Sequence, residues 1–147
     1  MGRILESEEE IAEAVRSIRV VAVIGMKDER EPETAAHRIP KALQAQGMRV
    51  IPVNPKLVQA LGEPAYASIG AVPDRFDTVD VFRRSSAIGE VADAVIALPP
   101  ARRPRLVWLQ LGIRNDEAAR RLSEAGMDVV QDRCLMVEAA RLPGGRG

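Results

Sequence analysis

Cationic side chains recur just after the apolar runs of this sequence. Lys27 follows the run Val20–Ile24, Lys56 follows the run RVIPV, and Arg83 follows the run TVDVF. Ammonium and guanidinium groups bind anions through charge-assisted hydrogen bonds, so these positions are candidates for holding a charged ligand. If the apolar runs are strands of one parallel sheet, the three cations lie along the same edge of it.

Covalent or acid–base chemistry has few candidates. His37 is the only histidine and Cys134 the only cysteine. We expect His37 to be a packed or surface side chain rather than a general base, and Cys134, next to Arg133, to be a small buried thiol, with a reactive thiol as the alternative. The sequence has no paired nucleophile and base and no cluster of metal ligands, so it offers no complete catalytic set.

The elements that must position these residues alternate between helices and strands. Ser7 and Glu10 have the spacing of a capping box, which predicts a first helix that continues to Ile18. Pro40 is unfavourable inside the second predicted helix, because it removes a backbone donor. It therefore favours a helix start later than Thr34. The remaining predictions are strands at Val20–Ile24, Arg49–Val53, Thr78–Phe82, Leu106–Gln110 and Asp128–Val130, helices at Thr34–Gln46, Ser86–Leu98 and Leu135–Leu142, a helix capped by Asn115 or Asp116 that ends near Gly126, and a short helical piece at Leu57–Leu61.

This order of elements predicts the fold class. Strands that alternate with helices form a three-layer, Rossmann-like α/β fold, here a doubly wound parallel sheet of about five strands with helices on both faces. The 147 residues fit a single domain, with a frayed tail from about residue 143. Backbone N–H groups near Gly25 are expected to face outward at the carboxyl edge of the sheet and to receive an anionic group.

The overall composition argues against several classes of protein. Lys and Arg number 21, as do Asp and Glu, which argues against binding to nucleic acid or to an anionic membrane. One cysteine excludes an intrachain disulfide, no apolar run has the length of a signal peptide, and none reaches the roughly 20 residues that cross a bilayer. We expect a cytoplasmic protein, and a protein partner or a homo-oligomer stays open.

The residues at the strand ends discriminate between nucleotides. NAD sites usually have G-x-G-x-x-G after the first strand and an acidic residue at the end of the second, and neither is present. Lys56 in place of that acid favours an adenosine with a phosphate on its ribose, as in NADP or coenzyme A (CoA). Two enzymes therefore remain as alternatives: an NADP-dependent reductase with Tyr66 as proton donor, and a small acyl-CoA-handling enzyme that uses Cys134.

Several long motifs in the same order resemble the stand-alone CoA-binding domain family. Its members are similar to the N-terminal CoA-binding domain of the succinyl-CoA synthetase α subunit. The resemblance extends from about Arg19 to Leu142. Its motifs are VAVIG (Val21–Gly25), VIPVNP (Val50–Pro55), DVFRRS (Asp80–Ser85), VWLQLGIRNDEAA (Val107–Ala119) and AGMDVVQDRC (Ala125–Cys134).

The resemblance implies a set of CoA-binding residues at the strand ends. Lys27 departs from the small residue or serine that is common in the family, and it either contacts a phosphate or points to solvent. His37-Arg38 resembles a family His-Arg pair, but Ala36 replaces the serine that often precedes it. The implied contacts are Gly25, Met26 and Lys27 against the phosphates, Val53, Asn54, Pro55 and Lys56 beside the adenosine and its ribose phosphate, Phe82, Arg83, Ser85 and Ile88 along the pantetheine and pyrophosphate, and Gln110, Leu111 and Gly112 near the adenine.

The resemblance also bears on whether the protein is an enzyme. The synthetases couple this domain to a following domain with a phosphorylated histidine, and this chain ends where the first domain would end. We therefore expect a module that binds CoA or an acyl-CoA without a complete catalytic set of its own.

Overall fold

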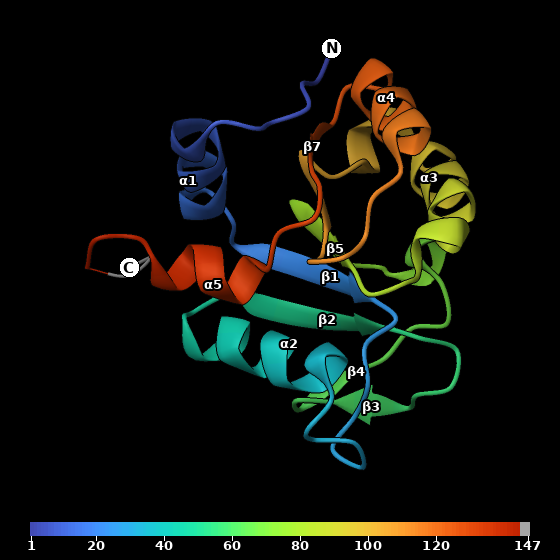
Figure 1. Cartoon of the computed structure of the whole chain (residues 1–147). Coiled ribbons are helices and arrows are strands. Elements are labelled where there is room, and N and C mark those ends of the chain that lie inside the picture. The colour runs from blue at the N-terminus through green and yellow to red at the C-terminus, as the bar shows by residue number, and fades with distance from the viewer. Residues whose placement is uncertain (145–147) are drawn as a thin grey trace.

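Five short runs rich in valine and isoleucine pair into one parallel sheet. The computed structural model describes residues 1–144 and gives the strand order β2-β1-β5-β6-β7 (Figure 1). Branched side chains at these positions are restricted at χ1 and fill both buried faces of the sheet. All five strands were predicted, to within one residue at each end: β1 (Val20–Ile24), β2 (Arg49–Val53), β5 (Thr78–Val81), β6 (Leu106–Leu109) and β7 (Asp128–Val130).

Helices cover the two faces of this sheet, which confirms the Rossmann-like α/β fold (Figure 1). The Ser7–Glu10 capping box and the Asn115 N-cap are both present, as predicted. Short 3-10 turns η1 (Ile69–Ala71), η2 (Ser85–Ala87) and η3 (Pro100–Arg102) lie in the connections. The helices are α1 (Glu8–Arg16), α2 (Ala35–Ala45) and α5 (Leu135–Ala140) on one face, and α3 (Ile88–Ile96) and α4 (Asp116–Glu124) on the other.

Both outer strands of the sheet have a short partner segment. Ile4 forms a parallel bridge with Val129 of β7, and the Leu5 N–H donates to the Val129 carbonyl at 2.8 Å. At the other edge Tyr66 pairs with β2, donating its N–H to Pro52 and accepting from Asn54. These segments satisfy backbone groups that an open sheet edge would leave unpaired.

The prediction of a helical piece at Leu57–Leu61 is wrong. These residues lead into β3 (Gln59–Ala60), which pairs antiparallel with β4 (Glu63–Pro64). Leu61 and Gly62 form the turn with φ values of 53° and 76°. Two consecutive positive φ angles are typical of a tight hairpin turn, and the Glu29 carboxylate stabilises this one by accepting the Leu61 N–H at 2.9 Å.

The second helix begins later than Thr34, as expected, but only by one residue. α2 starts at Ala35, after the N-cap Thr34, yet Pro40 still lies inside the helix and beyond its first turn. Pro40 is buried there, as are Ile39 and Leu43 on the same helix. The helix therefore keeps a residue that usually disrupts helical hydrogen bonding.

The described chain ends in a turn at Pro143 and Gly144. The rest of the predicted frayed tail lies outside the described residues. Among helices of residues 1–144, none has both the length and the apolar character needed to cross a membrane.

Candidate functional site

The carboxyl ends of β1, β2 and β5 open into a cavity of about 670 Å³. Small-molecule sites in α/β proteins have this size and this position. The cavity continues between residues 67–69 and the exposed flank of α3. Its lining residues are Ile24, Gly25, Lys27, Val53, Asn54, Pro55, Lys56, Ala67, Ser68, Ile69, Phe82, Arg83, Arg84, Glu90, Val91 and Ala94.

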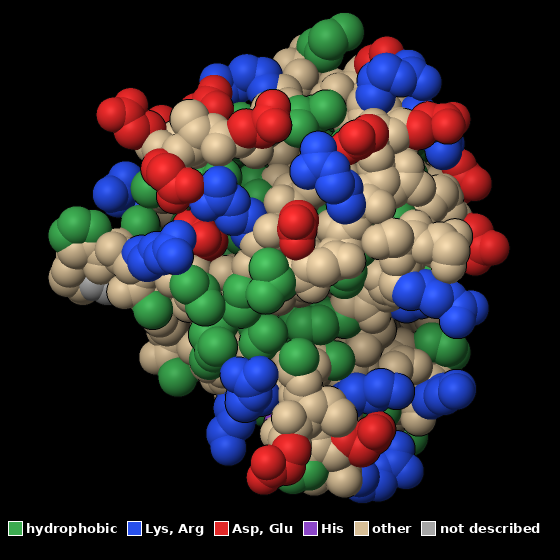
Figure 2. Space-filling view, in the orientation of Figure 1, with side chains coloured by type: hydrophobic (Ala, Val, Ile, Leu, Met, Phe, Trp, Pro, Cys, Tyr) green, Lys and Arg blue, Asp and Glu red, His purple; other side chains and the backbone are tan. Residues whose placement is uncertain are grey.

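The cavity lining is strongly cationic. Lys27, Lys56, Arg83 and Arg84 line it, and Glu90 is the one carboxylate among its lining residues in the described chain. The whole chain has a formal net charge of zero, and Figure 2 shows charges of both signs interspersed over one face. Positive charge is therefore concentrated at this cavity, where it attracts anions.

Gly25 is required by the close approach of two loops. Its φ is +83°, and a Cβ atom there would collide with the Phe82 carbonyl oxygen. Only glycine avoids both the collision and the strain of a positive φ. The first turn after β1 therefore lies tightly against the end of β5.

The prediction that backbone N–H groups near Gly25 face outward is wrong for two of them. The Gly25 N–H donates to the Val53 carbonyl at 2.9 Å, and the Lys27 N–H donates to the Ala36 carbonyl at 3.1 Å. These donors are used within the chain. Attraction of an anion at this edge consequently rests on the lysine and arginine side chains.

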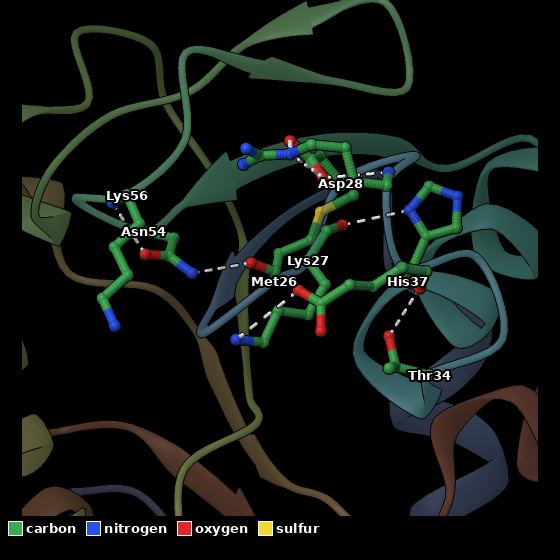
Figure 3. Close-up of polar contacts among 9 residues, drawn as sticks. Met26, Lys27, Asp28, Thr34, His37, Asn54 and Lys56 are labelled. Atoms are coloured by element: carbon green, nitrogen blue, oxygen red, sulfur yellow. Dashed lines mark hydrogen bonds and ion pairs between the residues drawn. The ribbon is translucent and has the colours of Figure 1, made fainter.

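Two side chains fix the loop after β1 (Figure 3). Asn54 donates from Nδ2 to the Met26 carbonyl at 2.8 Å and accepts the Lys56 N–H at 2.9 Å. His37 lies 3.0 Å from the Lys27 carbonyl through Nδ1, and because a carbonyl only accepts, Nδ1 carries the proton. His37 is 2% exposed, so it is packed, as predicted.

The two lysines reach the cavity from neighbouring loops. Figure 3 shows the Lys27 and Lys56 side chains extending to the same side of these loops. Lys27 lies 3.9 Å from Glu31, and both side chains are well exposed, so this ion pair is weak. Lys27 lines the cavity, and its contact with a phosphate stays a prediction.

Three residues implied as CoA contacts are buried away from the cavity. Met26 and Ile88 have fully buried side chains in the two hydrophobic cores, on opposite faces of the sheet. Gln110 is also buried, and its Oε1 accepts the Leu135 N–H at 3.1 Å. The residue types alone did not predict this burial, because an apolar or amide side chain near a strand end can pack in a core or contact a ligand equally well.

Three more implied contacts lie near the carboxyl ends of β5 and β6. Leu111 is 68% exposed, and the Gly112 N–H donates to Asp132 at 2.6 Å. Ser85 Oγ accepts the Arg114 N–H at 3.1 Å. None of the three lines the cavity. Ligand contact by these three residues and by Met26, Ile88 and Gln110 stays a prediction.

Several lining residues were missed by reasoning from the sequence. Val91 and Ala94 have the i, i+3 spacing of one helix face, which was a usable signal. Residues 67–69 carry no such sequence signal. They reach the cavity because Tyr66 pairs with the edge of β2, and the segment around Tyr66 lacks the alternation of a strand. The missed positions are Ile24, Ala67, Ser68, Ile69, Glu90, Val91 and Ala94, together with Arg84, which lies within the motif DVFRRS.

The residues of the two alternative enzymes lie outside the cavity lining. Cys134 is half-buried against the core beneath α1, α2 and α5, and Tyr66 is half-buried against the core of the other face. Within residues 1–144 no group of three or more His, Cys, Asp or Glu side chains is arranged to hold a metal ion. The arrangement at the cavity supports binding of an anion.

Asp80 is an unusual buried group in the central strand β5. It is 0% exposed, it lies between Val23 and Trp108 in register, and neither carboxyl oxygen makes a good hydrogen bond among the described residues. Burial raises the pKa of Asp80 well above its ordinary value, and the weak opposing contact with the Val81 N–H lowers it less. The Asp80 carboxyl group is therefore buried without a good hydrogen-bonding partner among the described residues.

Comparison with known proteins identifies the family. Residues 19–140 match the CoA binding domain family. The chain belongs to this family. The resemblance of its motifs to the stand-alone CoA-binding domains is thereby confirmed.

Proteins of similar length resemble this chain in sequence and in fold. The uncharacterized protein YneT of Bacillus subtilis (strain 168) is 35% identical over 134 residues, which cover 91% of this chain and 95% of YneT. The structure of cell-free ID.343 from Thermus thermophilus superposes with a TM-score of 0.82 at 40% identity and covers 92% of this chain and 98% of its own. A hypothetical protein from Pyrococcus horikoshii OT3 gives a TM-score of 0.83 at 31% identity, with 97% of each chain covered.

Proposed function

We propose that this protein binds CoA or an acyl-CoA in the cavity at the ends of β1, β2 and β5. The observation that carries the proposal is the group of four cations, Lys27, Lys56, Arg83 and Arg84, around a cavity of about 670 Å³. CoA carries a pyrophosphate and a separate ribose phosphate, so several cations at different points of one cavity match its charges. Membership of the CoA-binding family supports the same ligand.

Lys56 is the residue that we assign to the ribose phosphate. It follows the second strand, at the position where dinucleotide-binding folds contact the ribose. The bond from its N–H to Asn54 fixes its backbone, and its side chain lines the cavity. The other proposed contacts that line the cavity are Gly25, Lys27, Val53, Asn54, Pro55, Phe82 and Arg83.

Calorimetry with four ligands tests the proposal. We expect CoA and acetyl-CoA to bind, and NADP and ATP to bind much more weakly, because only CoA combines the ribose phosphate with a long tail. Binding of NADP without binding of CoA would favour the reductase and overturn the proposal.

We further propose that the protein is a cytoplasmic binding module. The absence of a paired nucleophile and base in the sequence supports this, and the single cysteine fits a reducing compartment. Its partner is then CoA itself, together with a protein or a second copy that uses the bound CoA. Rapid alkylation of Cys134 by iodoacetamide, slowed by CoA, would instead favour the acyl-CoA enzyme.

A further inference from the structure

Pro40 lies inside α2, where a proline is costly. It is the sixth residue of a helix that runs Ala35–Ala45. A proline in a helix interior donates no hydrogen bond to the carbonyl four residues earlier, and its ring crowds that carbonyl. At Pro40 the carbonyl concerned is that of Ala36.

The Ala36 carbonyl has a different partner, and that partner belongs to the cavity. It accepts the N–H of Lys27 at 3.1 Å. The next residue of α2, His37, donates from Nδ1 to the Lys27 carbonyl at 3.0 Å (Figure 3). Successive residues of α2 therefore hold both backbone polar groups of Lys27, whose side chain lines the cavity.

We propose that Pro40 is a positioning residue for ligand binding: by leaving the Ala36 carbonyl without a helical donor, it reserves that carbonyl for Lys27. The inference rests on the proposed binding of CoA and adds a role for a residue outside the cavity. It also gives a reason for the proline, because the hydrogen bond lost within α2 is replaced by one that connects α2 to the loop after β1.

Without the proline, two backbone N–H groups would compete for the Ala36 carbonyl. Any other residue at position 40 brings an N–H that is aimed at the Ala36 carbonyl by the helix itself. The Lys27 N–H then shares or loses its acceptor, and the Lys27 backbone keeps only the bond from His37 to its carbonyl among the contacts described above. A lysine on a looser loop loses more freedom when it binds a phosphate, so affinity falls.

The first test follows the Lys27 amide without any ligand. In Pro40→Ala we expect its hydrogen exchange to be faster than in the wild type, while the melting temperature stays equal or rises, because the helix gains a donor. Pro40→Val, which keeps a side chain of similar volume, should behave in the same way. Unchanged exchange at Lys27 in a folded variant would overturn the inference.

The second test measures CoA affinity in a double-mutant cycle. Pro40→Ala should weaken CoA binding about three- to tenfold. This is a fraction of the free energy of a hydrogen bond to a charged group, here between Lys27 and a phosphate. In a Lys27→Ala background the same change should have no further effect. Pro100→Ala, a proline change outside the cavity, is the control and should leave affinity unchanged.

The outcomes separate this inference from the proposed function. Wild-type protein that does not bind CoA overturns the proposed function. If the wild type and Pro40→Ala bind CoA with equal affinity, only the role of Pro40 is overturned. The same holds if Pro40→Ala lowers the affinity equally in the wild-type and Lys27→Ala backgrounds. A variant that is more stable and yet binds CoA less tightly supports the inference, since a merely structural role would move both quantities in the same direction.

Discussion

The carboxyl edge of the sheet has two halves that differ in how their polar groups are used. At the ends of β1, β2 and β5, cations line an open cavity. At the ends of β6 and β7, polar groups bond to one another: Gly112 N–H to Asp132, Asn115 N–H to Gln131 and Leu135 N–H to Gln110. We call these the open half and the filled half.

The comparison shows why position at a strand end is not enough to assign a ligand contact. Parallel sheets bring every carboxyl end to one edge, but a ligand needs space and unused polar groups there. The filled half has a smaller cavity, of about 200 Å³, and the bonds of Asp132, Gln131 and Gln110 are made within the chain. The open half has left four cations facing a cavity, although it too has used the N–H groups of Gly25 and Lys27.

The largest expected effect distinguishes the glycines of the two halves. Gly25 and Gly112 have almost the same φ, +83° and +84°, but an added Cβ collides with the Phe82 carbonyl only at Gly25 and meets nothing within 4 Å at Gly112. Gly25→Ala should lower the free energy of unfolding by about 3 kcal/mol or more, and Gly112→Ala by about 1 kcal/mol. Urea denaturation of both variants measures this, and equal losses would contradict the tight packing of the open half.

The next effect compares two buried polar groups, Asp80 in β5 and Gln110 directly after β6. Gln110 has a hydrogen-bond partner, whereas Asp80 lacks a good one among the described residues. The pKa of Asp80 is raised in the folded state, so between its unfolded pKa near 3.8 and its folded pKa the folded state alone holds the proton. Stability is then full below the unfolded pKa and falls by about 1.4 kcal/mol per pH unit as pH rises through this interval.

Asp80→Asn removes this titration and tests it. We expect the variant to match the wild type near pH 4 and to be increasingly more stable than it at higher pH. Denaturation curves between pH 4 and 8 give the difference. A constant difference over this range would show that the carboxyl group is ionised in the folded protein.

The sequence predicted the fold well because the relevant signals are local. The run Val20–Ile24 can be read as a buried strand without knowing its neighbours, and the Ser7–Glu10 spacing defines a helix start by itself. The exception, Leu57–Leu61, failed because Leu61 adopts a positive φ that its residue type does not favour.

The cavity lining was predicted only in part, for a physical reason. Lys56 and Arg83 were recognised from charge and position, and both line the cavity. Gln110 was an equally good candidate by type, and only the tertiary structure shows that its Oε1 already accepts the Leu135 N–H. Residues 67–69 reach the cavity because Tyr66 pairs with β2, a long-range contact that no local pattern encodes.

A ligand-binding measurement sharpens the contrast between the halves. Lys56→Ala should weaken CoA binding by about 1–3 kcal/mol, the usual worth of a hydrogen bond to a charged group. Dephospho-CoA should be insensitive to the change, because it lacks the ribose phosphate. Arg114→Ala, in the filled half, is the matched control and should leave CoA affinity unchanged in the same calorimetric titrations. Equal losses for CoA and dephospho-CoA would remove Lys56 from the ribose phosphate.

The smallest expected effect concerns the carboxylate in the cavity lining. Glu90 repels a phosphorylated ligand, so Glu90→Gln should tighten CoA binding by about twofold at low salt and by less at high salt. Asp93→Asn changes the charge of α3 equally but at a residue that does not line the cavity, and it should have a smaller effect. Indistinguishable results for the two variants would mean that only the total charge of the helix matters.

The most direct test of the account is a titration of the labelled protein with CoA, followed by the shifts of its backbone amide resonances. We predict the largest shifts at residues 25–27, 54–56, 67–69 and 82–84, with residues 113–115 and 131–134 unaffected. Shifts confined to residues 110–115 and 131–134 would contradict the assignment of the ligand to the cavity between β1, β2 and β5.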